Sequence, residues 1–121
     1  MATAQVNEGF LWAVEAAADL SAAVGKLVKI DSNGQATLAG ADEKAVGVVY
    51  EASLNTSAPY GPVTIQYAGV ARVVTGAAIS VGARVACGAS GKAKAGTTNP
   101  IGIALTESGG DGQVISVALV A

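Results

Sequence analysis

The chain has 121 residues and a net charge of −2 at pH 7, from seven basic and nine acidic side chains. Charged residues make up only 13% of it, and the basic ones are scattered. Proteins that bind nucleic acid normally present a basic stripe, so we expect no nucleic-acid partner. There is no histidine, and a single cysteine, Cys87, excludes an internal disulfide. Because general bases and zinc sites mostly need histidine or clustered cysteines, we expect no enzyme, no metal site and no cofactor.

The N-terminal residues show no periodic pattern, so we predict an arm over residues 1–8 and one β-barrel domain over residues 9–121. The arm is either a plain tail or a segment that orders on a partner, for example by adding a strand. It lacks the basic region of a secretory signal. No apolar run reaches the length of a membrane-spanning helix, so we expect no membrane partner.

Apolar and polar residues alternate over residues 10–16, which is the period of a strand. Alanine, glutamate and leucine over residues 11–23 also favour a helix. We prefer the strand because residues 67–73, which lie 57 positions later, are rich in glycine and valine and match it in place. A single helical turn is expected at residues 19–23.

The most informative pattern is an internal repeat of one β-rich unit. In the first copy Asn33-Gly34 separates two apolar runs, and this dipeptide favours a hairpin because both residues tolerate positive φ. Ser90-Gly91 takes the same place in the second copy. The hairpins align at an offset of 57 (81 against 24), and the strands that follow align at 55 (Gly102 against Gly47). The predicted strands are residues 26–30, 35–39 and 45–51 in the first copy and residues 81–87, 92–95 and 100–104 in the second.

The remaining segments complete the prediction. A loop at residues 53–61 leads into one long strand over residues 62–74, with a bulge at Gly69. The glycine-rich residues 108–112 lack the Lys-Ser/Thr ending of a phosphate-binding loop and are predicted to be a hairpin turn before a last strand at residues 114–120. About nine short strands without a long helix predict an all-β fold, a small single-domain barrel or sandwich. We expect the two halves to share one pseudo-symmetric barrel, in which each half covers the edges of the other.

Three side chains stand out as structural or interface residues. Cys87 takes the place that Ile30 has in the first copy, which predicts a small buried side chain. Trp12 is either packed in the core or an anchor at an interface, because Trp and Tyr are enriched at interfaces. Tyr60, on a proline-flanked loop, has the same two interpretations.

The two copies are not equivalent in charge. Arg84 stands where the first copy has Leu27, and Lys94 stands where it has Thr37. A charged side chain is rarely buried without a partner. We therefore expect these positions of the second copy to face solvent or a neighbouring subunit.

The motifs of the repeat also carry a family resemblance. In chain order they are Gly25-Lys26-Leu27-Val28-Lys29-Ile30-Asp31, Asn33-Gly34, Ala45-Val46-Gly47-Val48, Pro62-Val63-Thr64-Ile65-Gln66, Gly69-Val70-Ala71-Arg72-Val73, Ile79-Ser80-Val81-Gly82, Ile101-Gly102-Ile103-Ala104 and Asp111-Gly112-Gln113-Val114-Ile115-Ser116-Val117. Each motif is only an apolar strand or a glycine turn. Their order and spacing over residues 8–120 resemble the capsid cement, or head decoration, proteins of tailed bacteriophages.

The resemblance implies a structural virion protein on the outer surface of the capsid. Such a protein binds the major capsid protein as homotrimers at threefold and quasi-threefold positions and bridges neighbouring capsomers. It implies no catalytic residue and no cofactor. It also implies that the arm contacts the shell or a neighbouring subunit. The candidate interface residues are Met1, Ala2, Thr3, Ala4, Gln5, Val6, Asn7, Glu8, Gly9, Trp12 and Tyr60.

Two other functions stay open on the residues alone. The first is a carbohydrate-binding or adhesion β-barrel module, which needs a groove with exposed aromatic side chains. The second is another virion structural subunit, such as a tail protein.

Overall fold

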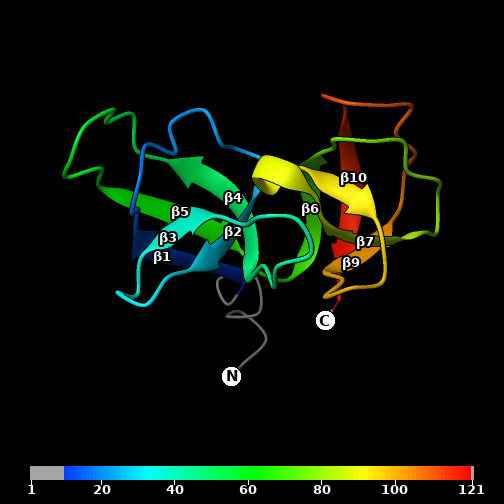
Figure 1. Cartoon of the computed structure of the whole chain (residues 1–121), viewed down its shortest axis with the longest axis horizontal. Coiled ribbons are helices and arrows are strands. Elements are labelled where there is room, and N and C mark those ends of the chain that lie inside the picture. The colour runs from blue at the N-terminus through cyan, green and yellow to red at the C-terminus, as the bar shows by residue number, and fades with distance from the viewer. Residues whose placement is uncertain (1–9, 121) are drawn as a thin grey trace, which may run out of the picture.

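The structure, a computed structural model, describes residues 10–120. It is a small all-β domain of two five-stranded antiparallel sheets, as the sequence predicts, and the sheets lie side by side along its long axis (Figure 1). The first sheet holds β1 (Leu11–Glu15), β2 (Leu27–Ile30), β3 (Ala36–Leu38), β4 (Gly47–Ala52) and β5 (Pro62–Gln66). The second holds β6 (Gly69–Val74), β7 (Arg84–Cys87), β8 (Ala93–Ala95), β9 (Gly102–Ala104) and β10 (Val114–Leu119), with a 3-10 turn, η3 (Ala89–Gly91), before β8.

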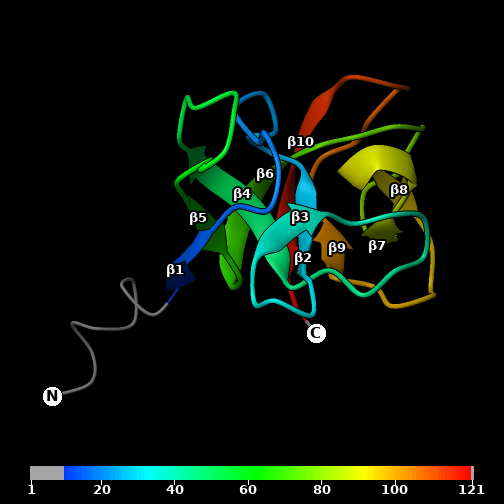
Figure 2. The same cartoon turned by 60° about the vertical axis from the view of Figure 1, so that its left-hand side comes forward.

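The internal repeat extends over the whole described chain. The strand order is β1-β5-β4-β2-β3 in one sheet and β6-β10-β9-β7-β8 in the other, which is the same order shifted by five strands. The chain completes the first sheet before it enters the second (Figures 1 and 2). No helix among residues 10–120 has the length and apolar character needed to cross a membrane.

Each sheet closes on itself. A parallel bridge joins Ala16, just after β1, to Ala36 on β3, and the equivalent bridge joins Thr75 to Ala93. The backbone hydrogen bonds next to these bridges, Ala17 N–H to Ala36 O and Gly76 N–H to Ala93 O, are both 2.8 Å long. The halves therefore form two small barrels, the first over residues 11–66 and the second over residues 69–119, rather than sharing one.

The register of the repeat differs from the prediction at its start. Ala16 and Thr75 make equivalent bridges, so β1 and β6 correspond at an offset of 59 (75 against 16) and not 57. The cause is the turn after β1, which is two residues longer than the turn after β6. The predicted offset of 57 holds for β2 and β3, as the pair Ala36 and Ala93 shows. The last strands of the two copies, β5 and β10, correspond at an offset of 52 (117 against 65). Ile65 pairs with β4 in the same way as Val117 pairs with β9.

Two predicted elements are wrong. The long strand over residues 62–74 is two strands, because β5 pairs with β1 and β4 while β6 pairs with β10 in the other sheet. Gly69 is the first residue of β6 and has a φ of +81°, so it marks a change of sheet and not a bulge. Residues 19–23 form a turn closed by Ala23 N–H and Leu20 O, 2.9 Å apart, and not a helical turn.

The two predicted hairpins are confirmed. β2 pairs with β3 around residues 31–35, where Gly34 has a φ of +77°. The carboxylate of Asp31 accepts hydrogen bonds from the backbone N–H groups of Asn33 and Gln35 at 2.9 and 3.0 Å, which fixes this turn. β7 pairs with β8 in the same way around η3.

One glycine in each barrel sits where two strands come too close for a side chain. A Cβ on Gly47 would collide with the backbone oxygen of Gln66, and a Cβ on Gly102 would collide with that of Ala118. These glycines are the central residues of the Val-Gly-Val and Ile-Gly-Ile blocks. The blocks therefore need glycine because β4 lies close to β5 and β9 lies close to β10.

The cores show how the barrels are joined. Residues of the first barrel that point inward, such as Val28, Val49 and Ile65, form one buried cluster. Leu27 and Val48 point to the other side of the same strands and belong to the buried cluster of the second barrel. The outer face of the first barrel therefore completes the core of the second.

Candidate interaction surfaces

The contact between the two barrels, which we call the seam, is built mainly from backbone groups and small side chains. Its residues are Gly25, Leu27, Ala39, Asp42 and Val48 of the first barrel and Ala71, Val74, Cys87, Gly91 and Lys94 of the second. Three backbone hydrogen bonds cross it, from Val74 N–H to Gly25 O (2.8 Å), from Gly91 N–H to Ala39 O (2.9 Å) and from Asp42 N–H to Cys87 O (2.9 Å). These bonds fix the orientation of one barrel on the other.

An ion pair lies at the rim of the seam. Lys94 Nζ and Asp42 Oδ1 are 2.8 Å apart, with side chains 34% and 50% exposed. Exposed pairs of this kind contribute roughly 0–1 kcal/mol, so the pair adds little to stability. The pair does explain why a lysine stands where the first copy has Thr37, because Lys94 faces the first barrel of the same chain.

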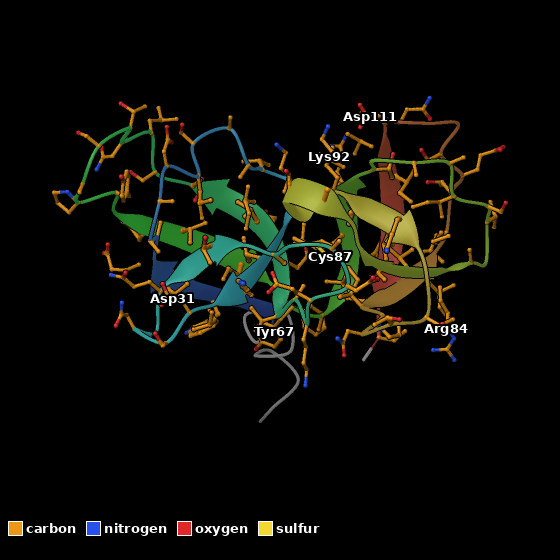
Figure 3. All side chains as sticks on the ribbon, in the orientation of Figure 1. Asp31, Tyr67, Arg84, Cys87, Lys92 and Asp111 are labelled. Carbon is orange, nitrogen blue, oxygen red and sulfur yellow. The ribbon has the colours of Figure 1, made fainter. Side chains whose placement is uncertain are left out.

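Cys87 lies in the seam and is fully buried, as predicted from its place in the repeat (Figure 3). Its thiol, with one proton to donate, lies 3.2 Å from Gly88 O and 3.4 Å from Ala39 O. Burial, with a smaller contribution from the carboxylate of Glu43, raises the pKa of the thiol to about 11. The thiol is therefore protonated and inaccessible at neutral pH, and it acts as a packing residue.

The first barrel contributes one face to the seam and the second barrel contributes a different face. On each barrel, the face that is equivalent to its partner's seam face is therefore uncovered. Val48 is 2% exposed in the seam, whereas its equivalent on the second barrel, Ile103, is 38% exposed. Arg84, the equivalent of Leu27, is exposed at the end of the molecule that points away from the first barrel (Figure 3). We call Gly82, Arg84 and Ile103 the free outer face of the second barrel.

The first barrel has the complementary free face. Ala71 is 1% exposed in the seam, whereas its equivalent, Trp12, is 46% exposed. Ile30 takes the place of Cys87 and is half-buried. We call Trp12, Glu15, Ile30 and Gly34 the free end face of the first barrel.

The structure decides between the two interpretations of Trp12 as far as the monomer is concerned. Its exposure places the indole on the surface, so the core alternative is wrong. Its use as an interface anchor stays a prediction. The side chain lies opposite Ile65 on β5, at the far end of the β1–β5 pair from Tyr60.

Tyr60 is placed differently. It is half-buried and packs against the core of the first barrel, next to Gly61, whose carbonyl accepts a 3.0 Å hydrogen bond from Ala16 N–H. The structure does not bring Tyr60 and Trp12 to one site. The other predicted interface residues, Met1 to Gly9, lie outside the described residues, and their role stays a prediction.

A shallow groove of about 290 Å³ runs beside the seam. Its lining is mainly apolar and comes from equivalent residues of both barrels, namely Val46 and Ile101, Tyr67 and Leu119, and Lys44 and Asn99. Tyr67 is its one aromatic residue among those described. This groove could not be predicted from the sequence, because it depends on how the barrels are placed side by side.

The described residues hold no group of three or more His, Cys, Asp or Glu side chains that could bind a metal ion. Several charged side chains are instead paired across turns. Lys29 Nζ lies 2.8 Å from Glu43 Oε2, and Lys92 Nζ lies 3.0 Å from Asp111 Oδ1. The hydrogen bonds from Lys29 and from Gly40 N–H hold the pKa of Glu43 below its usual value.

The comparisons with known proteins rest on shape and not on sequence. No protein-family model matches the chain, and no curated protein matches it. One solved structure aligns over 91% of this chain and 92% of its own, with a TM-score of 0.70 and 16% sequence identity. It is the N base of head fiber gp8.5 of bacteriophage phi29. At this identity the likeness establishes a common fold. The common fold includes the two-barrel arrangement, because the alignment covers nearly all of both chains.

Proposed function

We propose that this chain is a structural protein of a tailed-phage virion that binds the outer surface of the capsid and stabilises it by bridging capsomers. The observation that carries this proposal is the fold, which is that of a phage head-fiber base over nearly the full length of both chains. The resemblance of the repeat motifs to capsid cement proteins supports it independently. The major capsid protein is the proposed partner.

The proposed mechanism is mechanical. A packed genome pushes the shell outward, and a protein bound across two capsomers raises the free energy needed to separate them. As a homotrimer at threefold and quasi-threefold positions, the protein would bind through three linked contacts, and linkage raises avidity by orders of magnitude. The low net charge of −2 allows many copies to sit close together without strong repulsion.

The test is reconstitution on the shell. Purified protein is incubated with expanded capsids that lack it, and the particles are imaged by cryo-electron microscopy. We expect added density on the outer surface at threefold and quasi-threefold positions, and greater resistance of the particles to heat. Particles without added density at saturating protein would overturn the capsid-binding proposal.

The arm is the segment proposed to reach the shell or a neighbouring subunit. We expect deletion of residues 1–8 to weaken capsid binding while the circular dichroism spectrum of the barrels is unchanged. The matched control replaces the same residues by a Gly-Ser segment of equal length, which keeps the reach of the arm and removes its side chains. Equal capsid binding by all three proteins would exclude the arm from the mechanism.

The second candidate is the base of a head appendage, because a solved structure of the same fold is a head fiber base. The same images separate the two: a base gives density at isolated sites that projects outward, whereas cement gives a regular layer across capsomer boundaries. A carbohydrate-binding module is less well supported, since the groove at the seam has Tyr67 as its one described aromatic residue.

A further inference from the structure

The seam joins unlike faces of two equivalent barrels. Gly25 and Gly91 are packed within it, since a Cβ on Gly25 would lie 2.9 Å from Val74 Cγ2 and one on Gly91 would lie 2.8 Å from Leu27 O. A Cβ on their equivalents, Gly82 and Gly34, would meet no atom within 4 Å. If a two-fold axis related the barrels, Gly82 would be packed in the same way as Gly25, and Gly34 in the same way as Gly91. The barrels are therefore related head to tail, and each chain ends in one unused copy of each seam face.

The unused faces have the composition of an interface. Ile103 and Arg84 lie on the free outer face, and Trp12 and Glu15 lie on the free end face, all of them exposed. Trp and Arg are enriched at protein interfaces, and an Arg guanidinium gains from a Trp ring and from a carboxylate. The charges on the two faces are opposite, so the faces complement each other as the seam faces do.

The geometry of the seam indicates a closed assembly. Asp42 and Asn99 occupy equivalent turns and share a left-handed conformation, with φ of +62° and +48°. They touch each other, since Asn99 Nδ2 donates a 2.9 Å hydrogen bond to Asp42 O. Equivalent turns that touch each other must lie near the axis that relates the barrels, which limits the translation along it. Head-to-tail contacts with rotation and little translation form rings rather than filaments.

We propose that copies of this chain associate head to tail, with the free outer face of one (Gly82, Arg84, Ile103) docked on the free end face of the next (Trp12, Glu15, Ile30, Gly34), so that the contact between chains repeats the seam within each chain. The inference rests on the self-association part of the proposed function and not on capsid binding. The groove at the seam then lies toward the centre of the ring, and each chain contributes two consecutive barrels to it.

The test measures association in solution with no capsid present. Sedimentation equilibrium over a wide range of protein concentrations should show that the wild type forms a discrete closed oligomer. Ile103→Glu and Trp12→Glu should each lower the association constant at least about tenfold, as expected for a hot-spot residue. Both positions are exposed in the monomer, so circular dichroism and thermal unfolding should match the wild type.

The matched control is Leu105→Glu. Leu105 lies two residues beyond Ile103, is 46% exposed and has Tyr50 as its equivalent, which stays 56% exposed with the seam in place. The proposal therefore expects Leu105→Glu to leave association unchanged. A loss as large as that of Ile103→Glu would contradict the assigned face.

Mixing the two blocked variants tests the polarity of the contact. Ile103→Glu keeps an intact end face and Trp12→Glu keeps an intact outer face, so the mixture should form dimers and nothing larger. A wild type that stays monomeric at all concentrations, or a mixture of the two variants that does not associate while the wild type does, would overturn the docking proposal. Either result leaves capsid binding to be decided by the imaging experiment, so the two proposals fail separately.

Discussion

Thr75 Oγ1 and Ser108 Oγ lie 2.7 Å apart inside the second barrel, where the two residues are 0% and 4% exposed. Thr75 Oγ1 also lies 3.0 Å from Gly110 O. Ala16 takes the place of Thr75 in the first barrel and has no such group. The glycine-rich residues 108–112 are thereby tied to the end of β6.

We expect Thr75→Val to lower the free energy of unfolding by about 1–3 kcal/mol, because it leaves the buried Ser108 hydroxyl without this partner. Urea unfolding followed by circular dichroism measures the effect. Thr37→Val, at a half-buried position on β3, serves as the control and should change stability by less than about 0.5 kcal/mol. Equal effects of the two substitutions would contradict a structural role for the hydroxyl pair.

The close approach of the strands at Gly102 makes a second prediction. Gly102→Ala should destabilise the protein by at least about 2 kcal/mol, since its Cβ would meet the backbone of β10, which cannot move aside as a flexible side chain would. Gly110→Ala is the control, because a Cβ there meets no atom within 4 Å. A Gly102→Ala protein as stable as Gly110→Ala would contradict a close contact between β9 and β10 at this position.

Gly91 and Gly34 form a matched pair for the seam. Both have positive φ, +75° and +77°, so alanine costs roughly 1 kcal/mol at either position from backbone strain alone. Gly91→Ala should cost more, because its Cβ also meets Leu27 O. The difference between the two in thermal unfolding isolates packing in the seam. Under the head-to-tail proposal Gly34→Ala should in addition weaken association, whereas a purely monomeric role predicts no such loss.

The buried thiol makes a prediction about pH. The pKa of Cys87 is raised from 9.0 to about 11, so between these values the unfolded chain loses the thiol proton while the folded one keeps it. This contribution to stability is complete below pH 9 and is lost as the pH rises toward 11. We expect wild type to lose more stability over this range than Cys87→Ala, measured by urea unfolding. In the native state the thiol should also resist alkylation at pH 8, and rapid alkylation without unfolding would show that the seam opens.

The repeat, the hairpins and the all-β class were visible in the sequence because they depend on local rules. Asn33-Gly34 and Ser90-Gly91 specify turns through their φ preferences, and Gly47 and Gly102 align the two copies of the repeat. The offset of β1 against β6 was not visible. It depends on the length of the turn after β1, and a short strand such as Leu11–Glu15 can be shifted by two residues without losing its alternation.

The interaction surfaces were predicted only in part. Arg84 was noticed because it breaks the repeat, and the structure places it on a free face. Ile103 was missed because it resembles Val48 in the sequence, and only the placement of the barrels makes one of them buried and the other exposed. Trp12 was noticed because of its residue type. Its exposure could not be predicted, because it depends on the seam, which covers Ala71 of the second barrel but leaves the equivalent Trp12 of the first barrel uncovered.

The direct connection between the barrels, Tyr67 and Ala68, has a consequence for how the two kinds of contact are built. It holds the seam faces at a high effective concentration that dilution cannot lower. The seam can therefore rely on small side chains such as Ala39 and Ala71 and on backbone geometry. A contact between separate molecules must offset the entropy of bringing them together, which needs larger and charged groups. The two free faces carry Trp12 and Arg84 at the positions where the seam has Ala71 and Leu27, as expected for a contact between separate molecules.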